Sequence, residues 1–423
     1  MAQSPIDHAG DVPRLGTVVR FRREAASTGV RELESGGFRV ASSRDFRTSA
    51  AVPNNFGGAD VQYFEHFGIA VVRRDSERLG PLVQRAMQER VVSSVRPERT
   101  YRALGQVTTT DAKVQAAAAV DETSVTWGLE ATKVALSNLT GAGIKVAVLD
   151  TGFDIAHQDF RGRTVVRKLF ASQSSEDDMQ GHGTHCIGTA CGPLRPVNGP
   201  RYGIACEAAI YAGKVLGDDG MGTDRSVIAG LDWALDQGCQ IISMSLGAAT
   251  QVGDQPNADY EQIGQACLDG GLVVIAAAGN ESRRPGYIAP IGSPANASTI
   301  MAVAALDSAL AVAPFSCGGI NPGQDVDIAA PGVDVLSSLP GSRYGRLSGT
   351  SMATPHASGV AALIAQSDMK YRGRALWERL LELAGTLPLP ARDVGKGLLQ
   401  APGQAVAVAS TRKWWQVFGF GDA

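Results

Sequence analysis

Apolar segments alternate with helical stretches from about residue 123 to residue 405. The run Ile144–Leu149 is apolar except for Lys145, and Ser226–Asp236 and Tyr260–Asp269 are predicted helical stretches. Further apolar runs of this kind are Ile210–Leu216, Ile241–Met244 and Leu272–Ala277. Buried strands that alternate with helices predict an α/β fold in which a doubly wound, mostly parallel sheet carries helices on both faces.

The N-terminal quarter of the chain follows a different pattern. Residues 16–46 carry only weak strand and helix signals, whereas Val61–Val72 is typical of a β-hairpin. A stretch with helical spacing comes next, and Val91–Val95 predicts a last strand. We therefore expect a small α+β domain over residues 36–104, preceded by a flexible region over residues 1–35.

The remaining segments complete the predicted organisation. Residues 105–122 have no strong period and are interpreted as a linker that leads into a main domain over residues 123–410. The last segment, residues 411–423, contains two tryptophans and two phenylalanines. We expect it to pack on the main domain, with a contact to a partner or to a membrane surface as the alternative.

Composition and charge narrow the class of protein. The chain is 44% hydrophobic and 19% charged, which is typical of a soluble globular protein and excludes wholesale disorder. Its formal net charge of -3 gives no reason to expect nucleic acid or an anionic membrane as a partner. Residues 1–104 nevertheless hold 16 Arg and no Lys and carry a net charge of +4, against -7 for the rest. Opposite charges favour docking of the two parts, although a drift in composition between domains explains the difference equally well.

Two further observations concern the compartment. No apolar run approaches the roughly 18 residues of a membrane span, and the start of the sequence lacks the apolar core of a signal peptide. Six cysteines in a chain of this length do not indicate a disulfide framework, so we expect reduced thiols. These features favour a cytoplasmic location, with secretion by a route not visible in the sequence as the alternative.

Four short motifs carry the candidate chemistry. Asp150 ends an apolar strand, His182 lies between two glycines at the start of a predicted helix, and Ser351 stands where another helix is expected to begin. A serine hydroxyl needs an adjacent base, an imidazole can take its proton, and a carboxylate can orient that imidazole. Asn280 ends a further apolar strand, and its amide can hold a developing oxyanion together with the backbone N–H of Ser351. Each residue alone has a structural explanation, such as a helix cap, but the combination predicts nucleophilic acyl transfer.

Together these motifs resemble the subtilisin family of serine proteases, with features of its proteinase K branch. The resemblance covers roughly residues 125–405 and keeps the family's order of Asp, His and Ser. It implies a serine endopeptidase that works through an acyl-enzyme intermediate and requires no cofactor for its chemistry. The implied catalytic residues are Asp150, His182 and Ser351, with Asn280 and Ser351 as the oxyanion hole. The motifs that carry the resemblance are Val146–Gly152, Gly181–His185, Ala276–Asn280 and Gly349–His356.

Three other functions fit the sequence less well. A catalytically silent binding module with the same fold would need a lost catalytic residue, and all three are present. An α/β-hydrolase esterase requires a G-x-S-x-G motif, but no glycine stands two residues after Ser351. A serine–glutamate–aspartate peptidase of the sedolisin type shares the Gly-Thr-Ser motif but lacks the motif around His182.

The resemblance also implies where a substrate binds. An extended, unfolded polypeptide would pair as an added strand, and an apolar pocket would take the residue before the scissile bond. We therefore expect a preference for large apolar residues there, with Glu281 at the pocket rim as a candidate acceptor of Lys or Arg. The implied substrate-binding residues are Gly220, Ser245, Leu246, Gly247, Ala277, Ala278 and Gly279.

Two other positions match features of the family. Asp159 falls on a ligand position of a common structural calcium site, although a solvated surface carboxylate explains it as well. Cys186 matches a free cysteine of the proteinase K branch. It lies one helical turn after His182, so we expect its thiol beneath the imidazole without a chemical role.

Residues 61–104 resemble the second half of the ferredoxin-like propeptide of subtilisins. This likeness implies a zymogen whose N-terminal domain aids folding, inhibits the enzyme and is cut off by it. We expect autocatalytic cleavage between Leu104 and Gly105, with Leu104 in the apolar pocket and Tyr101 in the pocket upstream. A permanent accessory domain and a cut elsewhere in residues 105–122 are the alternatives. The expected partners are thus polypeptide substrates and the chain's own propeptide, without nucleic acid and without a transmembrane segment.

Overall fold

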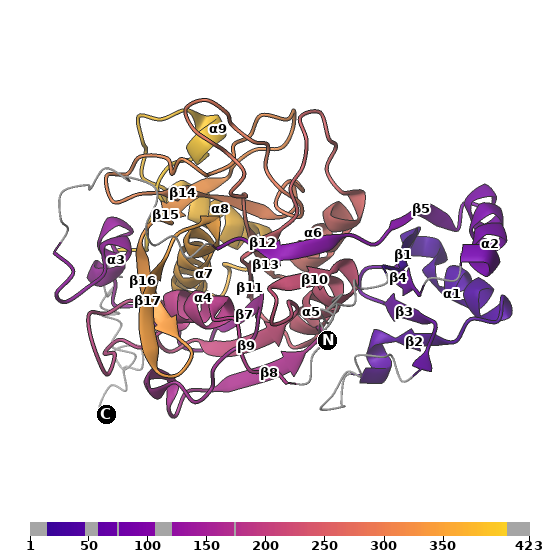
Figure 1. Ribbon diagram of the computed structural model, residues 1–423, viewed down its shortest axis with the longest axis horizontal. Helices are drawn as coiled ribbons and strands as arrows, with labels where there is room; N and C mark the ends of the chain where they lie inside the picture. The colour runs from indigo at the N-terminus through magenta and orange to yellow at the C-terminus, as the bar shows by residue number, and fades with distance from the viewer. Residues whose placement is uncertain (1–14, 47–57, 74–75, 106–120, 173–174, 404–423) are drawn as a thin grey trace, which may run out of the picture.

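The computed structural model describes residues 15–46, 58–73, 76–105, 121–172 and 175–403. These residues form a small N-terminal domain and a larger domain, and the small domain lies at one side of the larger one (Figure 1). Residues 106–120 of the predicted linker and the whole of the predicted aromatic tail, residues 411–423, lie outside the described residues.

The N-terminal domain is built on a five-stranded sheet with the strand order β2-β3-β4-β1-β5. All neighbouring strands are antiparallel except β2 and β3. Without β2, the chain order is βαββαβ and the topology is ferredoxin-like. The elements are β1 (Thr17–Phe21), α1 (Ala26–Ser35), β2 (Val40–Ser42), β3 (Val61–Phe64), β4 (Ile69–Val72), α2 (Ser76–Gln88) and β5 (Val92–Pro97).

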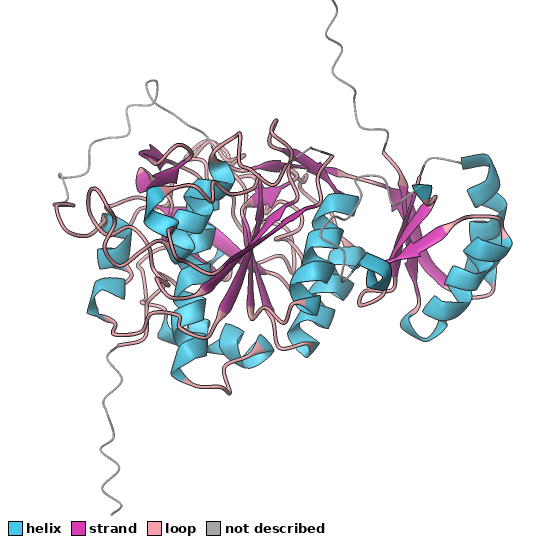
Figure 2. Ribbon diagram, turned by 90° about the horizontal axis from the view of Figure 1, so that it is seen from below, coloured by secondary structure: helices cyan, strands magenta, loops and turns pink. Residues whose placement is uncertain are grey.

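Both faces of this sheet are covered. Helices α1 and α2 lie on the outer face, and the sheet stands between them and the larger domain (Figure 2). The outer core includes Phe21, Leu33 and Leu79, while Phe64 and Val71 belong to a hydrophobic cluster with residues of the larger domain. The inner face is therefore buried between the two domains.

One predicted boundary is wrong. We expected residues 1–35 to be a flexible region outside the small domain, but β1 lies between β4 and β5 in its sheet, and α1 covers that sheet. The apolar side chains of Val19 and Phe21 are 1% exposed, so β1 is part of the core. Residues 1–14 lie outside the described residues.

The larger domain has the predicted α/β architecture. Its sheet has seven strands in the order β15-β14-β13-β11-β7-β9-β8, and every neighbouring pair is parallel. The strands are β7 (Lys145–Asp150), β8 (Val165–Leu169), β9 (Ala209–Lys214), β11 (Ile241–Met244), β13 (Val273–Ala277), β14 (Met301–Leu306) and β15 (Ile328–Pro331).

Helices cover both faces of this sheet, and two hydrophobic cores result. Along β7, Val146 and Val148 belong to one core, whereas Ala147 and Leu149 belong to the other, because side chains alternate along a strand. The first core contains residues of α4 (His182–Cys191), α7 (Thr350–Ser367) and α8 (Gly373–Leu383), and the second contains residues of α5 (Asp224–Asp236) and α6 (Ala258–Asp269). Smaller elements are α3 (Trp127–Ala131), α9 (Ala391–Val394) and the hairpin β16 (Val335–Leu339) with β17 (Arg343–Leu347).

A segment of the N-terminal domain enters the larger domain as a strand. After β5, strand β6 (Thr100–Ala103) lies between β10 (Met221–Thr223) and β12 (Leu246–Gly247) and pairs antiparallel with both. In Figure 1 it is the purple strand that runs from β5 into the larger domain beside β12. This strand carries the chain to the carboxyl ends of the parallel strands, where active sites of α/β sheets form.

Two sequence expectations can be compared directly with the fold. All six cysteines are buried and free, as expected. Among the described residues, no helix is both long and apolar enough to cross a membrane.

Candidate active site

Three side chains from distant parts of the sequence meet at one end of the parallel sheet. Asp150 is the last residue of β7, His182 is the first residue of α4, and Ser351 is the second residue of α7. The Nδ1 atom of His182 lies 2.7 Å from Oδ1 of Asp150, and both side chains are buried. Burial alone would lower the pKa of His182, but the Asp150 carboxylate raises that pKa well above its ordinary value.

The serine and the histidine are not yet hydrogen-bonded to each other. The Oγ atom of Ser351 donates to the carbonyl oxygen of Ser245 at 3.0 Å. The Nε2 atom of His182 is buried and has no hydrogen-bond partner among the described residues. The imidazole is therefore fixed on its Nδ1 side by Asp150, while its other nitrogen is available to a donor.

Asn280 follows β13 and is held from one side. Its Oδ1 atom accepts hydrogen bonds from the N–H of Thr350 at 2.9 Å and from the Thr350 hydroxyl at 2.8 Å. These two bonds assign the amide orientation, so that Nδ2 donates to the carbonyl oxygen of Leu104. A Cβ at Gly349 would collide with that carbonyl oxygen, which explains a glycine next to the site.

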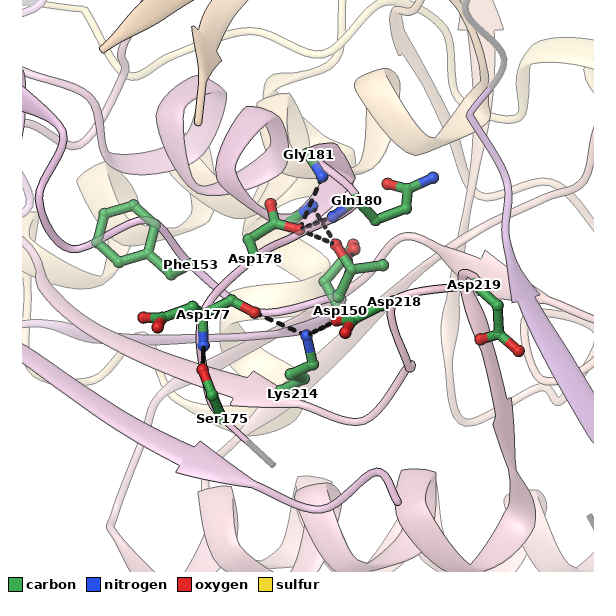
Figure 3. A network of polar contacts seen from close by, with 12 residues as sticks. Asp150, Phe153, Ser175, Asp177, Asp178, Gln180, Gly181, Lys214, Asp218 and Asp219 are labelled. Atoms are coloured by element: carbon green, nitrogen blue, oxygen red, sulfur yellow. Dashed lines mark hydrogen bonds and ion pairs between the residues drawn. The ribbon is translucent and has the colours of Figure 1, made fainter. Parts of the chain in front are cut away.

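The start of α4 is held by a carboxylate that the sequence analysis did not single out. Asp178 is 3% exposed, and its Oδ1 atom accepts from the N–H groups of Gly181 and Gln180 (Figure 3). The same carboxylate binds the Thr151 hydroxyl, which follows Asp150, and both the N–H and the hydroxyl of Thr184. Asp178 thus joins the strand that carries Asp150 to the helix that carries His182. An acidic residue four positions before a helical histidine was the available signal.

A buried ammonium group links two loops beside this network. Lys214, at the end of β9, is opposite Asp150 in the sheet and is 1% exposed. Its Nζ atom donates to the carbonyl oxygen of Asp177 at 2.7 Å and to Oδ1 of Asp218 at 2.5 Å (Figure 3). Lys214 therefore ties the loop before α4 to the turn that ends at Gly220.

The predicted substrate-binding backbone lies alongside β6. The N–H of Ala103 donates to the carbonyl oxygen of Gly220 at 3.0 Å, and the N–H of Leu104 donates to that of Ser245 at 3.2 Å. On β12, Leu246 is opposite Ala103 and Gly247 is opposite Arg102. The structure thus brings Gly220, Ser245, Leu246 and Gly247 together around one extended segment.

The Leu104 side chain is buried, with 4% of its surface exposed. A Cβ at Gly247 would lie 2.8 Å from Cδ1 of Leu104, so the glycine leaves the room that this side chain fills. Ala277, Ala278 and Gly279 are buried and lead from β13 to Asn280, and their role as the pocket wall stays a prediction.

The expectation that Asp159 is a calcium ligand does not fit its surroundings. Its Oδ2 atom accepts from the hydroxyls of Tyr202 at 2.6 Å and Tyr344 at 2.9 Å, and its Oδ1 atom accepts from the N–H of Val197 at 2.8 Å. Calcium requires oxygen atoms that offer lone pairs, whereas here three hydrogen-bond donors already occupy most of the acceptor sites of the Asp159 carboxylate. Nor is Asp159 a solvated surface group, since it is 7% exposed. The surroundings of Asp159 therefore fit calcium poorly, and no sequence pattern indicates this because Tyr202 and Tyr344 lie far from Asp159 in the chain.

Cys186 lies beneath the imidazole, as its spacing in the sequence indicated. Its Sγ atom is 3.8 Å from Nδ1 of His182 and 3.6 Å from the carbonyl oxygen of Ser351. Burial raises the pKa of this thiol, which favours the protonated form over a nucleophilic thiolate. Asp150, His182 and Cys186 form the one group of three or more His, Cys, Asp or Glu within metal-binding distance in the described part of the chain.

The arrangement has the parts of an acyl-transfer site. A peptide carbonyl, that of Leu104, accepts a hydrogen bond from the Asn280 amide at the N-terminus of the helix that carries Ser351. A hydroxyl, an imidazole, a buried carboxylate and an amide donor can together catalyse the attack on such a carbonyl. The fold and the site therefore place the protein in the class of serine hydrolases, on a parallel α/β sheet.

Comparisons with known proteins identify the family. A model described as "Subtilase family" matches residues 141–399. Subtilisin BL of Lederbergia lenta is 36% identical over 68% of this chain and 99% of its own length. M-protease of Shouchella clausii is 36% identical over 68% of this chain and 70% of its own length, and subtilisin E of Bacillus subtilis is 35% identical over 63% and 66%. The chain belongs to the subtilase family and is a serine-type endopeptidase that acts on polypeptides.

The comparisons do not support the expectation of a cytoplasmic location.

Proposed function

We propose that the chain is a self-processing zymogen that cuts its own Leu104–Gly105 bond and then hydrolyses other polypeptides. In this proposal Ser351 is the nucleophile, His182 is the general base and acid, and Asp150 orients and stabilises the imidazolium. The side chain of Asn280 and the backbone N–H of Ser351 form the oxyanion hole. These groups supply every function that peptide hydrolysis needs, so we expect no cofactor.

One observation carries the proposal: the Leu104–Gly105 bond lies beside Asn280 and His182, at the end of a strand held between β10 and β12, in the place that we call the cleft. Strand β6 is the middle strand between β10 and β12, and the carbonyl oxygen of Leu104 accepts from Asn280. Gly105 lies against the imidazole, since a Cβ there would be 2.7 Å from Nε2 of His182. A domain that served only as a permanent accessory would not need a peptide bond at this position.

The reaction begins with a rotation of the Ser351 hydroxyl from the Ser245 carbonyl to the free Nε2 of His182. Oγ then attacks the Leu104 carbonyl carbon while its proton moves to Nε2, and the carbonyl oxygen becomes an oxyanion near Asn280. The C–N bond to Gly105 breaks as Nε2 returns the proton to the leaving amine. Water, deprotonated by the same imidazole, hydrolyses the Leu104 ester and restores Ser351.

The preferences of the cleft follow from the side chains that fill it. Leu104 is buried in the first pocket, which supports a preference for large apolar residues before the scissile bond. Tyr101, three residues earlier, is 1% exposed and packs edge-on against Tyr260, with ring centroids 5.8 Å apart. Because only an extended chain can pair with both β10 and β12, we expect unfolded segments as substrates.

The N-terminal domain would act as an inhibitor after the cut. β6 occupies the strand position that a substrate needs, and the inner face of the domain stays buried against α5 and α6 through contacts that cleavage does not touch. Active enzyme would then appear only as the cut domain dissociates or is degraded.

The test is turnover of peptides and of the chain itself by Ser351→Ala. We expect a loss of roughly 10⁶ in kcat, the size that removal of this nucleophile produces in subtilisin, and a chain that stays full length. Asn280→Ala should lower kcat by about 10²–10³, because one oxyanion donor is lost while the other groups remain. Near-full activity of Ser351→Ala in a preparation free of other proteases would refute the assignment. A fully active wild-type enzyme that is never cut would refute the proposal that the chain is a zymogen.

A further inference from the structure

We propose that Glu281 makes the cleft selective for a positively charged residue at the third position before the scissile bond. Leu104 is the first residue before the bond, Ala103 the second and Arg102 the third. The inference deepens the proposed function, because it treats β6 as a substrate in place. It also changes the role expected for Glu281, which the sequence placed at the rim of the first pocket.

The contact that carries the inference joins the cleft wall to the third residue. The Nη2 atom of Arg102 lies 2.8 Å from Oε1 of Glu281. The first pocket holds the apolar side chain of Leu104, which is 4% exposed, so this pocket has no charge for Glu281 to meet. The carboxylate is thus used two residues further upstream.

Glu281 is also held by contacts that do not involve β6. Its Oε2 atom accepts from the backbone N–H of Asn280 at 2.8 Å and from Sγ of Cys317 at 3.3 Å. These bonds leave Oε1 for the ligand, and the carboxylate side chain is only 21% exposed. A charge that is already oriented loses less conformational entropy on binding than a mobile one.

The arginines that follow Glu281 in the sequence make their contacts elsewhere. Arg284 forms an ion pair with Asp393 at 2.6 Å and donates to the carbonyl oxygen of Ser316. Arg283 donates to the carbonyl oxygen of Ser282. The negative charge of Glu281 is therefore presented to the cleft.

Backbone pairing makes the contact a property of the cleft rather than of Arg102 alone. Arg102 is opposite Met221 on β10 and opposite Gly247 on β12. Any peptide that pairs with both strands in this register and ends its acyl part at the same carbonyl presents its third side chain at the same place. A Lys or Arg there meets Glu281, and an acidic residue is repelled by it.

The test compares peptides that differ only at the third position. Quenched fluorescent peptides Tyr-Xaa-Ala-Leu-Gly, with Arg, citrulline or Glu as Xaa, are offered to wild-type protein that has been incubated until its own processing is complete. Citrulline keeps the shape of arginine without its charge. Because the pair is partly exposed, we expect kcat/KM for Arg to exceed that for citrulline by about two- to five-fold, and Glu to be lower again by a similar factor. The differences should shrink in about 1 M salt.

Glu281→Gln should bring the three peptides to nearly equal kcat/KM. Glu378→Gln removes one negative charge from an exposed position on α8 and should keep the wild-type order. Equal hydrolysis of the three peptides by wild-type protein would overturn the inference and leave the proposed function intact. A preference that persists in Glu281→Gln would also overturn it. Failure of folded wild-type protein to cut any of the peptides would instead overturn the proposed function.

Discussion

The N-terminal domain meets the peptidase domain in two regions that differ in chemistry. On the inner sheet face, ion pairs accompany the apolar contacts: Arg96 lies 2.5 Å from Asp224 and 2.6 Å from Asp259, and Arg20 lies 3.0 Å from Asp259. In the cleft the contact is mainly backbone pairing of β6 with β10 and β12. The contacts of the inner sheet face hold the N-terminal domain on the peptidase domain independently of the sequence of β6. The pairing of β6 determines which peptide bond lies beside Ser351.

The ionic region also uses the starts of two helices. Asp224 and Asp259 lie in the first turns of α5 and α6, and Oε1 of Glu98 accepts from the backbone N–H of Arg225 at 3.0 Å. Three acidic groups at helix N-termini are favourable, and Arg96 offsets the charge of two of them. Burial lowers the pKa of Arg96, but Asp224 and Asp259 raise it above its ordinary value, so the guanidinium stays charged. The excess of arginine in the first 104 residues is therefore partly explained by docking.

Arg96→Ala should have the largest effect on the contact between the two domains. The substitution leaves the buried carboxylates of Asp224 and Asp259 without their shared partner. Loss of a buried charge partner mainly raises the rate of dissociation. After self-cleavage, we expect the N-terminal fragment to leave the enzyme about 10²-fold faster, measured as the rate at which peptide hydrolysis appears. Arg85→Ala is the matched control, since Arg85 pairs with Glu89 on the exposed side of α2. Release as slow as in wild type would show that the ionic region does not hold the domain.

Gly105→Val acts on the cleft region alone. A Cβ at residue 105 would lie 2.5 Å from Cδ2 and 2.7 Å from Nε2 of His182, so the imidazole or the scissile bond must move. Displacements near 1 Å at a reacting centre cost on the order of 10² in rate, and we expect self-cleavage to slow by that factor. Gly80→Ala, on α2 with nothing within 4 Å of the new methyl group, should process at the wild-type rate. The prediction fails if Gly105→Val is cut as fast as wild type at the same bond.

The pH dependence of self-cleavage reports on the same region. Asp150 raises the pKa of His182 in the uncut chain above that of a free imidazole, and the imidazole acts as a base only after it has lost its proton. The single-turnover rate should therefore rise with pH, with a midpoint above the ordinary histidine pKa of about 6.5. A midpoint at or below that value would contradict the raised pKa.

The smallest effect is expected from Cys186→Ala. The thiol lies beneath His182, and no hydrogen bond among the described residues joins it to β6. Activity and processing should therefore stay close to wild type. A mercurial bound at Cys186 would displace the imidazole, and the variant should lose sensitivity to it. Inhibition that persists in Cys186→Ala would place the sensitive thiol elsewhere, and loss of activity in a folded variant would give Cys186 a chemical role.

The sequence predicted those features that depend on neighbouring residues. Asp150, His182, Asn280 and Ser351 each stand in a short motif at the end of a strand or the start of a helix, and the structure brings all four together. The alternation of strands and helices likewise predicted the parallel sheet, because each apolar run is local.

Features that depend on distant partners were missed. The hydroxyls that donate hydrogen bonds to the Asp159 carboxylate come from Tyr202 and Tyr344, and no local sequence pattern predicts these contacts. Strand β1 has only a weak strand signal and falls within the region predicted to be flexible, because its five residues include an arginine and its partners, β4 and β5, lie about 50 and 75 residues later. No pattern in the sequence around Arg102 predicts its contact with Glu281, which lies 179 residues away.

The central claim is that Ser351 cuts the Leu104–Gly105 bond that lies beside it, and intact-mass measurement of the purified chain tests it most directly. Wild-type protein should give two species, an N-terminal fragment that ends at Leu104 and a body that begins at Gly105, while Ser351→Ala stays one uncut chain. Cleavage at the same bond in Ser351→Ala, in a preparation free of other proteases, would contradict the account, as would an active wild-type enzyme with the Leu104–Gly105 bond intact.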